Sequence, residues 1–125
     1  MDHTFTPGEK EIFERFTSGK SEHALTLVDY FIARFQEMGA VTVHPHKTMI
    51  SITRGNNGIA YITQLGKKFI HIVFPFYEAH ENNMCFQRIQ HVPGRWVIYH
   101  HLRMYEKDDL NEEVLRYMLL ALKGK

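Results

Sequence analysis

Hydrophobic residues recur at helical spacing in the first third of the chain. Pro7 suits the first turn of a short helix that ends near Gly19. Ser21 can cap a longer helix that stops at Gly39. The apolar positions of the longer helix recur every three or four residues: Ala24, Leu25, Val28, Phe31, Ile32 and Phe35. This stripe is wide, so we expect the longer helix to lie flat across a sheet.

From Val41 the hydrophobic period changes to two. The alternation predicts strands over residues 47–54, 59–64 and 69–74, joined by turns at 55–58 and 66–67. Residues 75–84 have no regular period and predict an irregular loop. Two further strands, 86–91 and 96–103, flank the turn residues Pro93 and Gly94. We expect a meander, because short hairpin links join antiparallel strands.

The end of the chain returns to helical spacing. Asp109 and Glu112 fit a capping box, which predicts a helix start. Its inward positions are Val114, Leu115, Met118, Leu119 and Leu122. Together the elements predict one α+β domain over residues 1–125, with an antiparallel sheet of about five strands, two N-terminal helices and one C-terminal helix.

The hairpin around Pro93 and Gly94 has two faces of different chemistry. Side chains alternate along a strand, so a turn of two or four residues sorts this hairpin cleanly. One face is then apolar and predicted to join the core: Ile89, Trp96, Ile98 and Leu102. The other is polar: Arg88, Gln90, Arg95, Tyr99, His101 and Arg103. Over the whole sheet we expect the apolar face to be built on Ile52, Tyr61, Ile72 and Ile98.

The polar face of the hairpin predicts an anion site. A guanidinium group matches a carboxylate or phosphate with paired hydrogen bonds, and His and Tyr can add further ones. The alternative interpretation is a solvated outer face on which arginines lie over tyrosine rings. Both interpretations stay open at this point.

Composition narrows the classes of function. Fifteen basic and fourteen acidic residues leave a formal charge of +1, which argues against a protein that binds nucleic acid or an anionic membrane through bulk charge. No apolar run reaches the roughly 18 residues needed to span a bilayer. Residues 1–4 lack the features of a signal peptide. We therefore expect a cytoplasmic protein that does not associate with membranes.

The positions of the histidine and cysteine residues do not lead us to predict a metal site or a catalytic site. His44 and His46 have an HxH spacing that could form a metal site with His71, His100 or His101, but Pro45 between them should kink the strand. We expect His71 to face away from the core, and His100 to lie in it and hydrogen-bond a backbone group. Cys85 is the only cysteine and is flanked by apolar residues, so we expect it to be inert. We predict no catalytic residues, no metal and no cofactor.

Several stretches resemble a small bacterial family of unknown function. The resemblance is carried by residues 16–20, by Met38 and Gly39, by residues 43–50, by the hairpin that contains Gly94-Arg95-Trp96 and ends in residues 100–103, and by a closing acidic-capped helix from 108 to 122. Members stand alone or form the C-terminal module of proteins labelled as predicted transport or endonuclease-like proteins. The resemblance implies that the polar positions of the family are Lys47, Arg88, His100, His101 and Arg103. The chain is also distantly similar to frataxin-like iron-chaperone domains, but it lacks their acidic helix ridge.

The leading hypothesis is a non-enzymatic module. It would bind a small anionic ligand, or an acidic segment of a partner, through a basic sheet face. The predicted binding residues are Lys47, Arg88, Tyr99, His101 and Arg103. The alternatives are a homodimerisation or protein-interaction module, which an open sheet face or edge would favour, and a histidine-based metal protein or enzyme.

Overall fold

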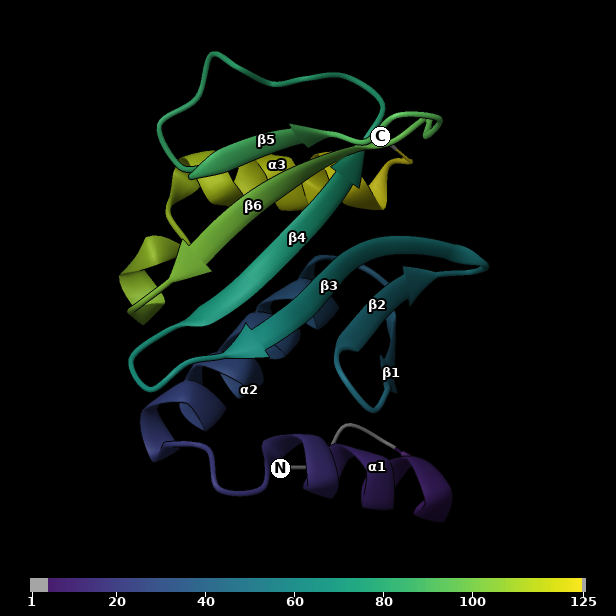
Figure 1. The fold of residues 1–125 in the computed structure, drawn as a ribbon, viewed down its shortest axis with the longest axis vertical. Helices are drawn as coiled ribbons and strands as arrows, with labels where there is room; N and C mark the ends of the chain where they lie inside the picture. The colour runs from purple at the N-terminus through teal and green to yellow at the C-terminus, as the bar shows by residue number, and fades with distance from the viewer. Residues whose placement is uncertain (1–4, 125) are drawn as a thin grey trace.

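The computed structural model describes residues 5–124, and it begins with two helices (Figure 1). Helix α1 (Pro7–Thr17) starts with a capping box between Thr6 and Glu9. Helix α2 (Glu22–Met38) is capped by the Ser21 side chain, which accepts a hydrogen bond from the Ala24 amide at 3.1 Å. Both helices are where the sequence predicts them. Residues 1–4, on which the expectation about a signal peptide depends, lie outside the described residues.

The middle of the chain forms one antiparallel sheet of six strands, one more than predicted. They are β1 (Thr42–Pro45), β2 (Ile50–Arg54), β3 (Asn57–Leu65), β4 (Ile70–Phe76), β5 (Arg88–His91) and β6 (Ile98–Met104). The additional strand is β1. The sequence pattern predicts a strand over residues 47–54 and none over 42–45. The start of the predicted strand is instead part of a turn, closed by the His46 amide and the Met49 carbonyl (2.8 Å), that separates β1 from β2.

The order of the strands is β1-β2-β3-β4-β6-β5, so the sheet is not the predicted meander. Strand β6 pairs along its whole length with β4, from Ile70 opposite Met104 to Phe76 opposite Ile98. The chain leaves β4, passes through loop 77–87, forms β5 at the edge, and returns through β6. Strand β6, which carries Tyr99, His101 and Arg103, therefore lies inside the sheet and not at its edge.

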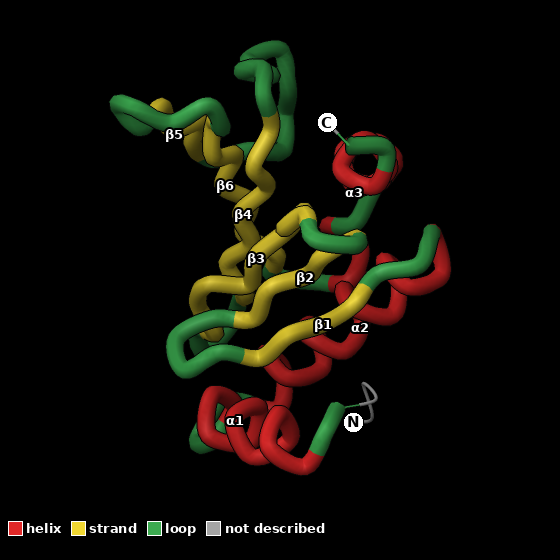
Figure 2. Tube along the Cα trace, turned by 90° about the vertical axis from the view of Figure 1, so that its right-hand side faces the viewer, coloured by secondary structure: helices red, strands yellow, loops and turns green. Residues whose placement is uncertain are grey.

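The helices α2 and α3 (Glu112–Leu122) both lie on the same face of the sheet (Figure 2). The core forms between them and the strand residues that point towards them: Ile50, Ile52, Ala60, Ile62, Ile70, Ile72, Phe74, Phe76, Leu102 and Met104. Helix α1 contacts β1 and lies at that edge of the sheet. The opposite face of the central strands is left without a helix among residues 5–124.

The start of α3 differs from the predicted capping box. Asn111 is the N-cap of α3, and its side chain accepts a hydrogen bond from the Val114 amide at 3.0 Å. Asp109 instead accepts from the Tyr105 and Glu106 amides, at 2.7 and 3.0 Å, and closes a short 3-10 turn, η1 (Lys107–Asp109). Three residues of types that can cap a helix occur within four positions, Asp108, Asp109 and Asn111, and the pattern selected the wrong one.

The β5–β6 hairpin keeps its predicted face sorting with a different register. Arg88 lies opposite His101 and Gln90 opposite Tyr99, so the polar residues do share a face. The register is offset by two positions from the prediction, since Ile89 lies opposite His100 and not opposite Ile98. Trp96 consequently falls in the connection between the strands and is 91% exposed, so its predicted place in the core is wrong.

Candidate functional site

The face of the sheet that no described helix covers carries a polar patch across β3, β4, β6 and β5, and we call it the open face. Its members are Tyr61, His71, Arg88, Gln90, Tyr99, His101 and Arg103. The register aligns them in rows: Tyr61, Val73, His101 and Arg88 in one, and Gln64, His71 and Arg103 in the next. Tyr61 is therefore on the open face, and its predicted place on the apolar face is wrong, because Ala60 and Ile62 point to the core.

Four side chains of the open face form one directional chain of hydrogen bonds. The Arg103 Nε–H can only donate, and it donates to His71 Nδ1 at 3.4 Å. The proton of a neutral His71 is then on Nε2, which donates to His101 Nδ1 at 2.8 Å. His101 in turn donates from Nε2 to Gln90 Oε1 at 2.9 Å. The chain is satisfied only when both imidazole rings are neutral.

The electrostatics of the patch also favour neutral imidazoles. Burial, followed by repulsion from His71 and Arg88, lowers the pKa of His101 to about 4. Burial, Arg103 and Arg88 likewise lower the pKa of His71 below its usual value. At neutral pH the positive charge of the open face therefore comes from its two arginines.

Arg103 and Arg88 lie near one another on the open face, and neither forms a salt bridge with a described residue. Arg103 lies over the Phe69 ring, with Cζ 4.3 Å from the ring centroid, which fixes its direction. Neither arginine has a carboxylate within salt-bridge distance in the described part of the chain. Arg88 is opposite His101, two residues along β6 from Arg103, and such diagonal neighbours have Cα atoms about 7 to 8 Å apart. Two unpaired guanidinium groups can thus approach one anion.

The six strands contain no Asp or Glu residue. Their only charged residues apart from histidine are Arg54, Arg88 and Arg103. Every acidic residue between 5 and 124 lies in a helix, a turn or a loop. The near-neutral total therefore conceals a segregation of charge, with a basic sheet and acidic surroundings.

Next to the basic residues the open face has an aromatic part, made by Tyr61 and Tyr99. Tyr99 lies opposite Pro75 in β4 and opposite Gln90 in β5. The Tyr61 ring lies along β3 over Gly58, where a Cβ would be only 2.0 Å from its Oη. Burial raises the pKa of Tyr61, and the Tyr99 phenol across β4 raises it further. Both rings are partly exposed.

The structure brings together four of the five predicted binding residues: Arg88, Tyr99, His101 and Arg103. It does not bring Lys47 to them, since Lys47 is in the β1–β2 turn beside Ile12 and Arg15 of α1. Sequence reasoning missed His71 and Tyr61 as members of the site, and it placed Gln90 on the polar face without counting it among the binding residues. His71 was recognised as facing away from the core, but its contact with His101 follows only from the β4–β6 pairing, which the sequence pattern does not specify.

His100 and Cys85 have structural roles. His100 is fully buried; its Nδ1 donates to the Ile98 carbonyl at 2.9 Å and its Nε2 accepts from the His80 amide at 3.0 Å. This confirms the expected core histidine bonded to backbone. Cys85 is held against Glu113, and burial followed by that carboxylate raises its pKa to about 12, so the thiol is a poor nucleophile at neutral pH.

The HxH pair lies at the other end of the sheet. His44 Nε2 contacts Thr53 Oγ1 at 3.1 Å, and His46 Nε2 contacts Ser51 Oγ at 2.9 Å. Of the residues that the structure describes, no three His, Cys, Asp or Glu side chains are grouped so that they could hold a metal ion. The two rings hydrogen-bond hydroxyl groups, which accounts for them without a metal.

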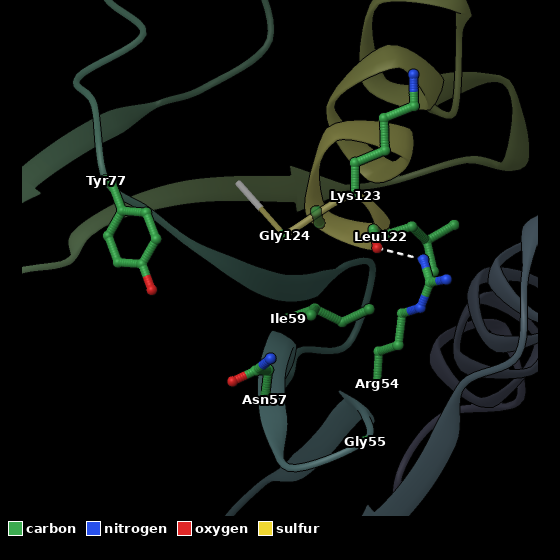
Figure 3. A pocket seen from close by; sticks show the side chains of 9 residues that line it. Arg54, Gly55, Asn57, Ile59, Tyr77, Leu122, Lys123 and Gly124 are labelled. Carbon is green, nitrogen blue, oxygen red and sulfur yellow. Dashed lines mark hydrogen bonds between the residues drawn. The ribbon is translucent and has the colours of Figure 1, made fainter.

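A separate cavity of about 640 Å³ opens at the C-terminal end of α3 (Figure 3). Ile59 and Ala121 are among its apolar lining, and Arg54, Asn57 and Tyr77 come from the strands and the loop around it. The Arg54 guanidinium donates to the Leu122 carbonyl, which ties β2 to the last turn of α3. Since its arginine satisfies a helix end, we assign this cavity a structural role and take the open face as the candidate site.

Within the described range no helix is both long enough and apolar enough to cross a membrane. No protein-family model, no curated protein and no solved structure matches the chain in the three comparisons that we made. The resemblance to a small bacterial family consequently stays a prediction, and the function has to be argued from the open face.

Proposed function

We propose that this chain is a non-enzymatic binding module, whose open face holds an anionic group between Arg88 and Arg103. The ligand is a small anion or an acidic segment of a partner. The observation that carries the proposal is a pair of arginines on an uncovered sheet face, without a carboxylate partner among residues 5–124. An unpaired guanidinium group that is held in place is ready to form charge-assisted hydrogen bonds with phosphate or carboxylate oxygens.

The supporting residues determine the geometry of the proposed site. Arg103 is held from below by Phe69 and from the side by His71. A side chain that is already ordered loses less entropy when it binds, so this arginine is pre-organised. The neutral His71–His101 pair provides polar rings without adding charge. Lys47 lies in a different region and is not part of the proposed site.

Neither the histidines of the open face nor the cysteine is available for covalent or acid–base chemistry. The inner nitrogens of His71 and His101 are engaged with one another at 2.8 Å, and the only cysteine is a buried thiol of raised pKa on the helix side of the molecule. A general base needs a free nitrogen within reach of a substrate proton. The geometry therefore supports binding better than catalysis.

The test is a calorimetric titration of the full chain with pyrophosphate and, separately, with a short oligoaspartate peptide. We expect the wild type to bind at least one of them. The double variant Arg88→Ala/Arg103→Ala should lose that binding by about tenfold or more, since hydrogen bonds to charged groups contribute about 1.5 to 3 kcal/mol each. The matched control Lys20→Ala/Lys47→Ala removes the same charge from exposed positions elsewhere and should bind like the wild type.

Two results would contradict the proposal. If neither probe binds the wild type, the open face is not an anion site. If the arginine double variant unfolds at the temperature of the titration while the control remains folded, the arginines are structural. Thermal unfolding of all three proteins separates these two cases.

A further inference from the structure

The open face offers more than charge, because its basic and aromatic parts adjoin. Tyr99 is two residues from His101 along β6, which is about 7 Å in a strand, and Arg88 lies opposite His101. Tyr99 on β6 and Tyr61 on β3 present two partly exposed rings on the same face as the arginine pair. A ligand with one anionic group and one planar group could contact both parts at once.

We propose that the ligand of the open face is a nucleotide unit, with its phosphate on Arg88 and Arg103 and its base stacked on the Tyr61–Tyr99 surface. This inference rests on the proposed anion site and specifies its ligand class. Base–aromatic stacking and arginine–phosphate contacts are the two interactions by which flat protein surfaces hold single-stranded nucleic acids and their nucleotides.

Three features of the open face favour a nucleotide over an acidic peptide. A carboxylate side chain would use the arginines and leave the two tyrosines without a partner, whereas a nucleotide uses both. The sheet has no Asp or Glu in any of its strands, so a chain of phosphates could continue along it without repulsion. The exposed Arg95, in the β5–β6 connection, adds a positive charge at the end of the hairpin that lies past Gln90 and Tyr99.

The near-neutral total charge argues against binding of nucleic acid through bulk charge, but it does not oppose this inference. A phosphate responds to the potential at the surface it approaches, and beyond about one Debye length (about 8 Å at physiological salt) exposed charges are largely screened. The helices and loops that carry the acidic residues are mainly on the other face or at the rim. Binding of a phosphate therefore depends on how charge is distributed over the surface, and not on the net charge of the chain.

Tyr61 has a built position on this surface. Gly58 leaves the space that its ring occupies, since a Cβ at residue 58 would be 2.0 Å from Tyr61 Oη and 2.8 Å from its Cζ. Next to it, Pro75 lies opposite Tyr99 and projects no long side chain between the rings. The two tyrosines thus lie on either side of β4 at the open face, Tyr61 opposite Val73 and Tyr99 opposite Pro75.

The experiment measures binding of three probes to the full chain: inorganic phosphate, uridine monophosphate and a labelled single-stranded oligouridylate. We expect the two nucleotide probes to bind more tightly than phosphate. Tyr99→Leu should weaken nucleotide binding by about thirtyfold, the middle of the range for one lost stacking partner, and leave phosphate binding unchanged. Tyr99→Phe keeps the ring and should bind nucleotides like the wild type, which a role of the hydroxyl group alone would not allow.

The probes also separate the two sources of a nucleotide. If the oligouridylate binds more tightly than the monophosphate, the ligand is a strand that covers several residues of the face; equal affinities assign a free nucleotide. Either result supports the inference.

The outcomes distinguish failure of the inference from failure of the proposed function. If phosphate or oligoaspartate binds through the arginines and the nucleotides bind no more tightly, the anion site stands and the nucleotide assignment is overturned. If Tyr99→Leu weakens phosphate and nucleotides equally, Tyr99 only supports the arginines and the stacking surface is wrong. If no probe binds, both proposals fail.

Discussion

At the scale of single residues, Gly58 and Tyr61 depend on one another. We expect Gly58→Ala to destabilise the fold by about 1 to 3 kcal/mol, the usual cost of inserting atoms into an occupied space, because its Cβ would overlap the Tyr61 ring. In a Tyr61→Ala background the same substitution should cost much less. A double-mutant cycle by urea unfolding measures this coupling. If Gly58→Ala costs the same in both backgrounds, its effect comes from the backbone and the contact is unimportant.

The His71–His101 pair makes a prediction about pH. The pKa of His101 is about 4 in the folded protein and near 6.5 when unfolded, so the unfolded chain binds more protons between these values. Stability is therefore fully present above about pH 6.5 and falls as the pH is lowered towards 4. His101→Gln should make this loss smaller, while His71 and His100, whose pKa values are lowered in the same direction, preserve part of it.

The measurement is the free energy of unfolding in urea at several pH values, for the wild type and His101→Gln. His91→Gln provides the control, because His91 is an exposed histidine at the end of β5. An identical pH dependence of the wild type and His101→Gln would show that His101 is not held neutral by its surroundings. The groups that face it are His71, Arg88 and Gln90, together with the buried His100 on the same strand.

At the scale of elements, the β5–β6 hairpin presents the chain's single tryptophan to solvent. Its turn uses Pro93 and Gly94, the latter at φ +80, and the Arg95 amide donates to the Val92 carbonyl at 3.1 Å. Trp96 follows this turn and is 91% exposed. We expect its fluorescence in the native protein to have the red-shifted maximum of a hydrated indole and to shift little on unfolding. A blue-shifted native maximum would mean that Trp96 is packed.

The same hairpin shows what the sequence could and could not predict. Alternation within one strand is local, so the sharing of a face by Arg88, Tyr99, His101 and Arg103 could be predicted. The position of Trp96 depends on the register, which an offset of two residues changes without altering the faces. Trp96 was assigned to the core because it alternates with Ile98 and Leu102, but β6 begins only at Ile98.

The pattern of hydrophobic and polar residues could not predict which distant strands pair with one another. The contact of His71 with His101 requires β6 to lie beside β4, and the chain reaches that arrangement through loop 77–87 and the edge strand β5. Loop 77–87 has no period, so nothing in it specifies where the next strand should pair. The helices were predictable because caps such as Ser21 and their apolar stripes are local signals.

At the scale of the whole molecule, the segregation of charge gives each proposal a distinct dependence on salt. For single strands the logarithm of the association constant falls with the logarithm of salt concentration by about 0.7 for each phosphate that is neutralised. One phosphate of an oligouridylate that lies on both arginines of the open face predicts a slope of about −0.7. A binding surface that involved the whole exposed complement of lysines and arginines would have a much steeper slope.

Single variants localise the source of that slope. Arg103→Ala should bring the slope closer to zero, since one of the two guanidinium groups on the phosphate is lost, and Arg88→Ala should do the same. Lys47→Ala removes an equal charge from the β1–β2 turn, on the far side of β3 and β4, and should leave the slope unchanged. Tyr99→Leu should lower the affinity at every salt concentration without changing the slope, because stacking releases no counterions. A slope that changes as much for Lys47→Ala as for Arg103→Ala would mean that the charge of the surface acts collectively, and that the open face holds no defined phosphate position.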